Sequence, residues 1–424
     1  MPTASSTLPR SQCCIVGGGP AGLMLGYLLA RAGVATTVLE KHADFLRDFR
    51  GDTVHPSTLR IVDELGLLDA FLRRPHQRLH AIGGWFGDRQ IRLGDFTGLP
   101  ERYAFIAMMP QWEFLDFIAA EARKLPSFSL RMSAHVTGLV SDADGRVVGV
   151  RGTEADSAFE LAADCTIGCD GRHSTVRAAA GFEVEDIGAP IDVLWFRVGR
   201  DPAALDTSLA RIGPGRMVVT IDRGDYWQCA FVVPKGGAEV LQRGPIETLR
   251  AQAMEAAPIL GPHIGDVRSW DDVKLLSVGI DRLRRWSKPG LLCIGDAAHA
   301  MSPVGGVGIN LAVQDAVAAA NLLAAKLRSG SVADDDLDAV RRRRLWPTRA
   351  TQAVQVAIQD NVLVPVLSRS NAELQVPLPL RVVSAMPSLQ RLFARLLGMG
   401  IRPEHVRSPA SGLSASASGG GAGP

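Results

Sequence analysis

Residues 13–22 read CCIVGGGPAG, and this stretch decides the fold that the sequence predicts. Its first four residues are apolar and partly β-branched, which is typical of a central parallel strand. Gly17, Gly19 and Gly22 have the G-x-G-x-x-G spacing, in which the first makes a tight turn, the second admits a pyrophosphate and the third lets a helix contact the strand. Pro20 suits the first helical position, and amides at a helix start favour phosphate.

The residues that follow support a dinucleotide-binding unit. Leu25, Leu28, Leu29 and Ala32 lie on one face of the expected helix, and a second strand over residues 34–39 leads to Glu40. An acid at this distance hydrogen-bonds the adenosine ribose in dinucleotide folds. An ordinary strand–helix–strand unit with a glycine turn is the less specific alternative.

Composition excludes several classes of protein. The chain has 424 residues, enough for two domains, and its formal net charge of +2 argues against a nucleic-acid partner. The six cysteines show no metal-type pairing, so we expect buried thiols in a reducing cytoplasm and no metal site. No run of about 18 apolar residues suggests a transmembrane span.

Three stretches that bear chemistry each follow a predicted strand. They are residues 17–22, Asp170-Gly171 and Gly295-Asp296. Because ligands bind at the carboxyl edge of an open α/β sheet, we expect the three to meet there. The glycine-rich loop at residues 303–308 would bring main-chain amides and a helix start to the far end of the same ligand.

Taken together, these motifs resemble a known family. GGGPAG (17–22), CDGRHS (169–174) with Arg177, and GDAAH (295–299) with Pro303 and GIN (308–310) are similar, in order and rough spacing, to the three motifs of the class A flavoprotein monooxygenases. This is the p-hydroxybenzoate hydroxylase-like family, which includes ubiquinone-biosynthesis hydroxylases. The resemblance covers roughly residues 11–345.

The resemblance implies one FAD, with NADPH or NADH as co-substrate and no second nucleotide fold. In this family, O2 forms a flavin C4a-hydroperoxide that hydroxylates a small aromatic molecule, phenolic or polycyclic. The alternatives are another flavoenzyme on the same scaffold (an epoxidase, a halogenase or a reductase) or a non-catalytic flavin-binding redox protein. A monomer and a homodimer both stay open.

The motifs also assign expected site residues. Asp296 should bind the ribityl chain, the amides of residues 308–310 should face the flavin pyrimidine edge, and Pro303 should lie near the reacting face. The predicted cofactor contacts are Gly17, Gly19, Ala21, Gly22, Glu40, Lys41, Arg50, Gln111, Val136, Asp170, Gly295, Asp296, Gly306, Gly308, Ile309 and Asn310. Asp170 and Asp296 have a blander alternative as caps at strand ends.

Other residues are candidates for proton transfer and substrate binding. His55 lies in a segment that passes near the flavin in this family, where a histidine can take a phenolic proton, although a structural role is the commoner one. Trp195, Arg197 and Tyr226 are candidate substrate contacts, with core packing or surface roles as alternatives. We expect His299 to orient its loop, and residues 341–344, all arginine, to form a solvated helix face.

The predicted fold class is α/β, with a Rossmann-like FAD-binding domain, an inserted, mostly antiparallel β-sheet substrate domain and a helical C-terminal region. The predicted segments are the FAD-binding domain at 11–80, 103–185 and 280–345; the substrate domain at 81–102 and 186–279; the helical region at 346–407; and a disordered tail at 408–424.

Overall fold

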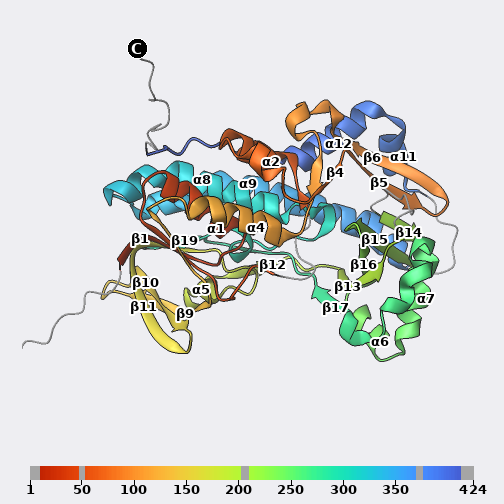
Figure 1. Cartoon of the computed structure of the whole chain (residues 1–424), viewed down its shortest axis with the longest axis horizontal. Helices are drawn as coiled ribbons and strands as arrows, with labels where there is room; N and C mark the ends of the chain where they lie inside the picture. Colours follow the sequence, from red (N-terminus) through yellow and green to blue (C-terminus); the bar gives the residue numbers. More distant parts are fainter. Residues whose placement is uncertain (1–9, 47–52, 202–209, 369–375, 412–424) are drawn as a thin grey trace, which may run out of the picture.

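The computed structural model describes residues 10–46, 53–201, 210–368 and 376–411 (Figure 1). The first motif lies in the middle of a mixed sheet whose main order is β19-β20-β11-β1-β2-β8, in which neighbours from β20 to β8 are parallel. Strands β9 and β10 extend β11 as an antiparallel meander. The strands are β1 (Arg10–Val16), β2 (Thr36–Leu39), β8 (Phe128–Arg131), β9 (Ala134–Ser141), β10 (Val147–Glu154), β11 (Ser157–Gly168), β19 (Ser287–Lys288) and β20 (Leu291–Cys293).

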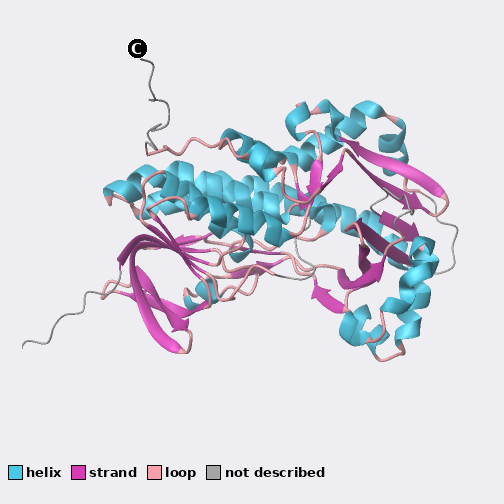
Figure 2. Ribbon diagram, viewed as in Figure 1, coloured by secondary structure: helices cyan, strands magenta, loops and turns pink. Residues whose placement is uncertain are grey.

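Helices cover one face of this sheet (Figure 2). Helix α8 is central and packs against α1 and α9, while α4 packs on the other side of α1. The stretch Val304–Ser329, which contains α8, is long and apolar enough to cross a membrane, but 83% of its most apolar window is buried, which fits a core helix. The helices of this layer are α1 (Pro20–Arg31), α4 (Gln111–Ala122), α8 (Gly308–Ser329) and α9 (Asp334–Ile358).

A second sheet has the order β17-β13-β16-β15-β14-β5-β6. All its pairs are antiparallel except β14–β5. One face packs against α6 and α7, and the other faces the C-terminal helices and the first sheet's loops. Its strands are β5 (Ala81–Phe86), β6 (Arg89–Asp95), β13 (Ile191–Gly199), β14 (Ala210–Gly213), β15 (Arg216–Asp222), β16 (Tyr226–Pro234) and β17 (Lys274–Ser277).

Short elements complete the chain. Two small sheets contain β3 (Thr53–Val54), β4 (Gln77–Leu79) and β7 (Ile106–Met108), and β12 (Val184–Asp186) and β18 (Asp281–Leu283). The other helices are α2 (Pro56–Glu64), α3 (Leu68–Phe71), α5 (Thr175–Ala179), α6 (Gly237–Gln242), α7 (Ile246–Ala256), α10 (Val364–Ser368), α11 (Leu378–Ala385), α12 (Pro387–Met399), the π-helix η7 (Gln359–Leu363), and the 3₁₀ helices η1 (Phe96–Gly98), η2 (Glu101–Tyr103), η3 (Pro258–Asp266), η4 (Trp270–Asp272), η5 (Gly295–Ala297) and η6 (Val304–Gly306).

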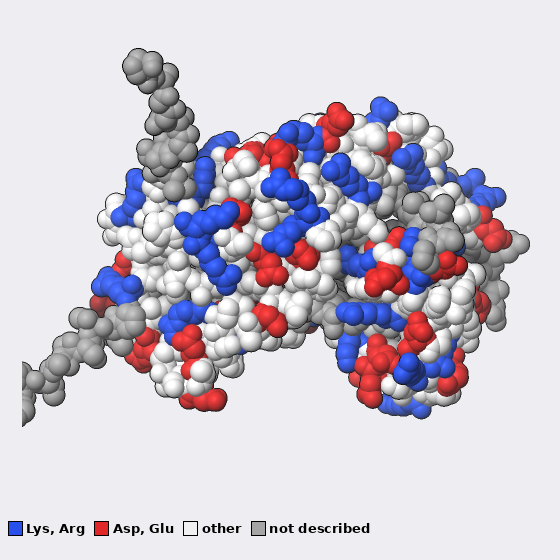
Figure 3. All heavy atoms as spheres, viewed as in Figure 1, with Lys and Arg blue, Asp and Glu red and all other residues white. Residues whose placement is uncertain are grey.

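One boundary differs from the sequence prediction. The predicted disordered tail starts at residue 408, but Ser408 is buried and Ser411 hydrogen-bonds the main chain of Arg31 at the end of α1. Packing therefore continues to residue 411, because the Ser408 amide donates to the Asn321 side chain on α8 and Ser411 donates to the Arg31 carbonyl. On the face seen in Figure 3, acidic and basic groups are interspersed, as the small net charge suggests.

Candidate active site

The first motif forms an open turn between β1 and α1. Gly17 has φ +105°, and a Cβ there would lie 2.5 Å from the main-chain oxygen of Cys169. A Cβ on Gly22 would lie 1.9 Å from the main-chain oxygen of Gly17. Around Gly19, in contrast, no heavy atom lies within 4 Å of the Cβ position, and no side chain caps α1. This open helix start, with amides lacking a side-chain acceptor, fits a pyrophosphate.

Glu40 is tied directly to this turn. One carboxylate oxygen accepts a hydrogen bond from the Gly18 amide at 2.8 Å, and the other accepts from the His42 amide at 3.0 Å. The acid thus stands at the carboxyl end of β2 beside the glycine turn, where the adenosine end of a dinucleotide would lie. Of the other predicted contacts, Ala21 and Val136 are buried, Gln111 is half-buried and Lys41 is exposed. Arg50 lies outside the described residues.

Asp170 turns its carboxylate toward the start of α5. It accepts hydrogen bonds from the Ser174 hydroxyl and, at 3.1 Å, from the Val176 amide. Burial raises the pKa of Asp170, and the hydrogen bonds from Ser174 and Val176 oppose that shift. The carboxylate therefore stabilises the turn of the second motif through hydrogen bonds within that motif, as expected if Asp170 acts as a cap. A contact between Asp170 and a cofactor stays a prediction.

The third motif begins at η5 and ends at the start of α8. Asp296 is exposed, as a residue that meets a polyhydroxyl chain must be, and no side chain caps α8. Asn310 does not point into open space, because its side-chain oxygen accepts from the His55 amide at 3.0 Å and from the Thr58 hydroxyl at 2.7 Å. The Thr53 hydroxyl donates to the Gly306 carbonyl at 2.8 Å, so the segment from 53 to 58 braces this loop.

A buried network of polar and charged side chains supports the same loop. Asp315 accepts from the Gly295 amide at 3.1 Å, from His299 Nε2 at 2.6 Å and from Arg344 Nε at 2.9 Å. Arg344 also contacts Glu404, 3.4 Å away. Burial alone would raise the pKa of Asp315, but His299 and Arg344 outweigh it and hold that pKa below its usual range. His299 therefore orients the loop.

Sequence reasoning missed Asp315 and misplaced Arg344. Arg341 and Arg342 form the solvated ion pairs expected of the arginine run, but Arg344 is only 1% exposed. A signal was present in both cases. Asp315 is the one acidic residue of helix α8 and lies in its apolar, alanine-rich part, and Arg344 follows the buried Leu337 by seven residues, which places it on the same helix face.

His55 is fully buried at the start of α2. Its Nδ1 lies 3.2 Å from the Leu397 carbonyl, so Nδ1 carries a proton, and Nε2 has no partner among the described residues. Burial lowers the pKa of His55 to about 4. The ring is therefore neutral near pH 7 and presents a bare acceptor, which makes it a weak base for holding a phenolic proton.

The substrate candidates share one face of the second sheet. The pairing of β13 with β16 places Trp195 opposite Ala230 and Arg197 opposite Gln228, and the Arg197 guanidinium lies 5.1 Å from the centre of the Tyr226 ring. Trp195 and Val304, the latter from the third-motif loop, pack against the same apolar cluster. This cluster joins the sheet to the candidate flavin site. Pro303, next to Val304, is exposed.

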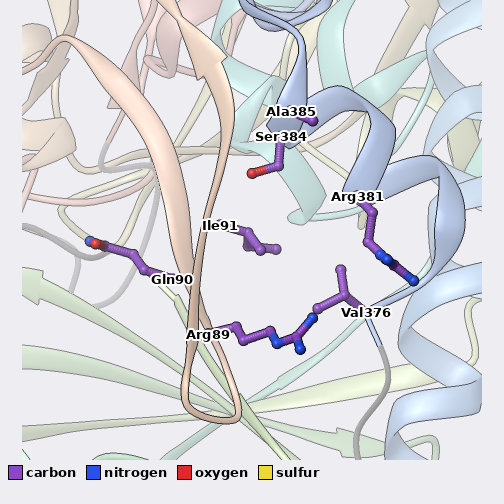
Figure 4. Close-up of a pocket in the computed structure, with 7 residues that line it drawn as sticks. All are labelled: Arg89, Gln90, Ile91, Val376, Arg381, Ser384 and Ala385. Atoms are coloured by element: carbon purple, nitrogen blue, oxygen red, sulfur yellow. The ribbon is translucent and has the colours of Figure 1, made fainter.

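Two surface cavities lie elsewhere, between β5–β6 and α11. The one shown in Figure 4, with a volume of about 370 Å³, has Arg89 and Arg381 on its rim. Its neighbour, about 400 Å³, shares Gln90, Ile91 and Ser384 with it. Neither is lined by a residue of the three motifs. These cavities are therefore separate from the candidate active site.

Comparison with known proteins agrees with this geometry. A family model described as "FAD binding domain" matches residues 10–357. This chain belongs to that family. It is 33% identical to the 6-methylpretetramide 4-monooxygenase of Streptomyces rimosus over 406 residues, which is 94% of each chain.

Two further relatives agree. The 12-dehydrotetracycline 5-monooxygenase/anhydrotetracycline 6-monooxygenase of the same species is 32% identical over 327 residues, 73% of this chain and 61% of that protein. The structure of the S. rimosus anhydrotetracycline hydroxylase OxyS matches 92% of this chain and 76% of its own, with a TM-score of 0.68 and 26% identity. The predicted family, fold class, FAD cofactor and monooxygenase activity are thereby confirmed.

Proposed function

We propose that this FAD-dependent monooxygenase hydroxylates a fused-ring phenol, using O2 and either NADPH or NADH. The main support for this proposal is the 33% identity, over 94% of each chain, to the 6-methylpretetramide 4-monooxygenase of S. rimosus. The apolar face around Trp195, next to the third-motif loop, supports a flat, largely apolar substrate.

The chain's own residues would bind the cofactor and orient it and the substrate. The open turn at Gly19 and the uncapped start of α1 would hold the pyrophosphate of FAD, and Asp296 its ribityl chain. The amides at the start of α8 would face the flavin ring, where a helix start stabilises negative charge. When bound, FAD would supply the redox chemistry that activates oxygen. Trp195 and Val304, which pack against one apolar cluster, would help to exclude water from the site.

We propose that His55 acts as a hydrogen-bond acceptor and as a support for Asn310, and not as a base that holds a proton. A ring whose pKa is about 4 holds almost no proton at neutral pH, but its unpaired Nε2 can accept a hydrogen bond. His55 also fixes Asn310 through its main-chain amide, and so braces the start of α8. Arg197 and Tyr226 are proposed to form the outer, polar end of the substrate site.

Anaerobic flavin reduction tests the proposal. The holoenzyme is mixed with NADPH or NADH, with and without a panel of phenols and fused-ring hydroxyaromatics, and flavin absorbance is followed. We expect at least one fused-ring phenol to accelerate reduction strongly, and a hydroxylated product to form after oxygen is admitted. Reduction by neither nucleotide with any compound present would contradict the proposed reaction.

A further inference from the structure

Three glutamines, two near the end of α9 and one at the start of η7, hydrogen-bond the third-motif loop. Gln352 donates to the carbonyls of Asp281 and Ala300, at 2.8 and 3.1 Å. Gln355 accepts from the Ser302 amide at 3.2 Å and donates to the Ser302 and Val304 carbonyls at 2.9 and 2.8 Å. In both of these side chains, the amide nitrogen and the amide oxygen have partners.

The third glutamine is only half satisfied. Gln359 is fully buried, and its Nε2 donates to the Ser302 hydroxyl at 2.9 Å. Its Oε1 finds no hydrogen-bond partner among the described residues. A buried carbonyl without a partner is costly, and such atoms are rare in native proteins. The free oxygen therefore points to a partner that is bound during function.

The position of Gln359 indicates what that partner is. It opens the π-helix η7, and π-helical turns occur frequently at functional sites. Leu363 and Leu367 follow it at four-residue spacing, and both belong to the apolar cluster that contains Trp195 and Val304. Gln359 thus lies where the third-motif loop meets the substrate-facing side of the second sheet.

We propose that Gln359 Oε1 accepts a hydrogen bond from a hydroxyl group of the bound substrate and so determines specificity. This inference rests on the proposed function and narrows it to fused-ring substrates that carry a hydroxyl group at this position. A site built to hydrogen-bond a hydroxyl rejects an analogue that lacks it far more strongly than an apolar pocket does, because the site's own polar group is then left unpaired.

The test measures binding to the holoenzyme by the change in flavin absorbance. The probes are 2,6-dihydroxyanthraquinone, whose hydroxyl groups are too far from the ring carbonyls to bond them internally, and anthraquinone, which lacks the hydroxyl groups. Gln359→Leu removes the acceptor, and Gln359→Glu keeps it. Ser302→Ala is the matched control, because it removes the partner of Gln359 Nε2 and leaves the free oxygen in place. Thermal unfolding of each variant monitors folding.

We expect Gln359→Leu to weaken binding of the dihydroxy probe roughly 10- to 100-fold and that of anthraquinone much less. Ser302→Ala and Gln359→Glu should retain the preference for the dihydroxy probe. Equal weakening by Gln359→Leu and Ser302→Ala, or by Gln359→Leu and Gln359→Glu, would overturn the inference. So would unchanged binding to Gln359→Leu, which would assign the free oxygen to an ordered water. If the unsubstituted holoenzyme binds no hydroxyaromatic compound, the proposed function itself fails.

Discussion

The first and third motifs both end at a helix start, yet they are held in different ways. The turn at residues 17–22 is shaped by main-chain packing, with glycines at the two positions where a Cβ would collide with main-chain oxygens. The loop at residues 295–310 is held by buried side chains: Asp315, on the helix that follows it, accepts from the Gly295 amide and is bound by the distant Arg344, and the distant Gln355 donates to the Val304 carbonyl.

This difference separates two kinds of determinant. A steric requirement at a glycine is local, so a short sequence pattern reveals it. A loop that depends on buried polar side chains needs each of its partners, and those partners come from α2, α9 and the chain beyond α12. We therefore expect substitutions in the first motif to destabilise the protein through steric clashes with the main chain. Around the third motif, we expect destabilisation when a hydrogen-bond or ion-pair partner of the loop is removed.

The largest effect is expected at Gly22. Gly22→Ala places a methyl group 1.9 Å from the Gly17 carbonyl, where only main chain can give way, so we expect a loss of roughly 4 kcal/mol or more in the free energy of unfolding. Gly19→Ala is the matched control, because space is open there. It should leave thermal unfolding of the apoprotein nearly unchanged but weaken FAD binding, measured by fluorescence titration. Equal stability loss in both variants would contradict the assignment.

The next effect is expected at Arg344. Arg344→Met leaves the buried carboxylates of Asp315 and Glu404 short of a partner, so we expect a loss of about 3–5 kcal/mol and weaker FAD binding. Arg342→Gln, two residues away on the exposed face, should cost less than about 1 kcal/mol. Urea unfolding and FAD titration measure both. Similar losses in the two variants would show that the network does not support the loop.

A smaller effect should appear with pH. His55 has a folded-state pKa of about 4, below the ordinary value of about 6.5, so between those values only the unfolded chain binds the proton. Stability should therefore fall as pH drops through this window, by up to about 3 kcal/mol. His55→Gln should flatten this dependence in urea unfolding. The lowered pKa of Asp315 acts in a separate window, since its contribution is present above about pH 4 and is lost below it.

The smallest effect is expected at Thr58. Thr58→Val removes one of the two hydrogen bonds that the Asn310 oxygen accepts, and the His55 amide keeps the other. We expect a loss of about 1 kcal/mol by urea unfolding. Thr97→Val, at an exposed hydroxyl bonded to Asp95, serves as the control and should change stability less. A loss at Thr58 no larger than at Thr97 would show that the brace is not needed.

The sequence by itself determined the central strand and the glycine turn, because apolar strand patterns, the spacing of glycines and an acid at a strand end are local rules. The family and the cofactor were implied by the resemblance of its three motifs to those of a known family. The sequence also indicated an inserted, mostly antiparallel sheet, which the structure shows as the second sheet, with one parallel pair, β14–β5.

Only the tertiary structure decided which polar groups meet. It showed that Asp170 turns toward α5, that Arg344 is buried, and that one oxygen of Gln359 is unpaired. None of these follows from residue type, because the cost or benefit of a buried polar group depends on partners that the fold brings together. Asp315 and Glu404 lie 89 residues apart in sequence, and both contact the single guanidinium of Arg344.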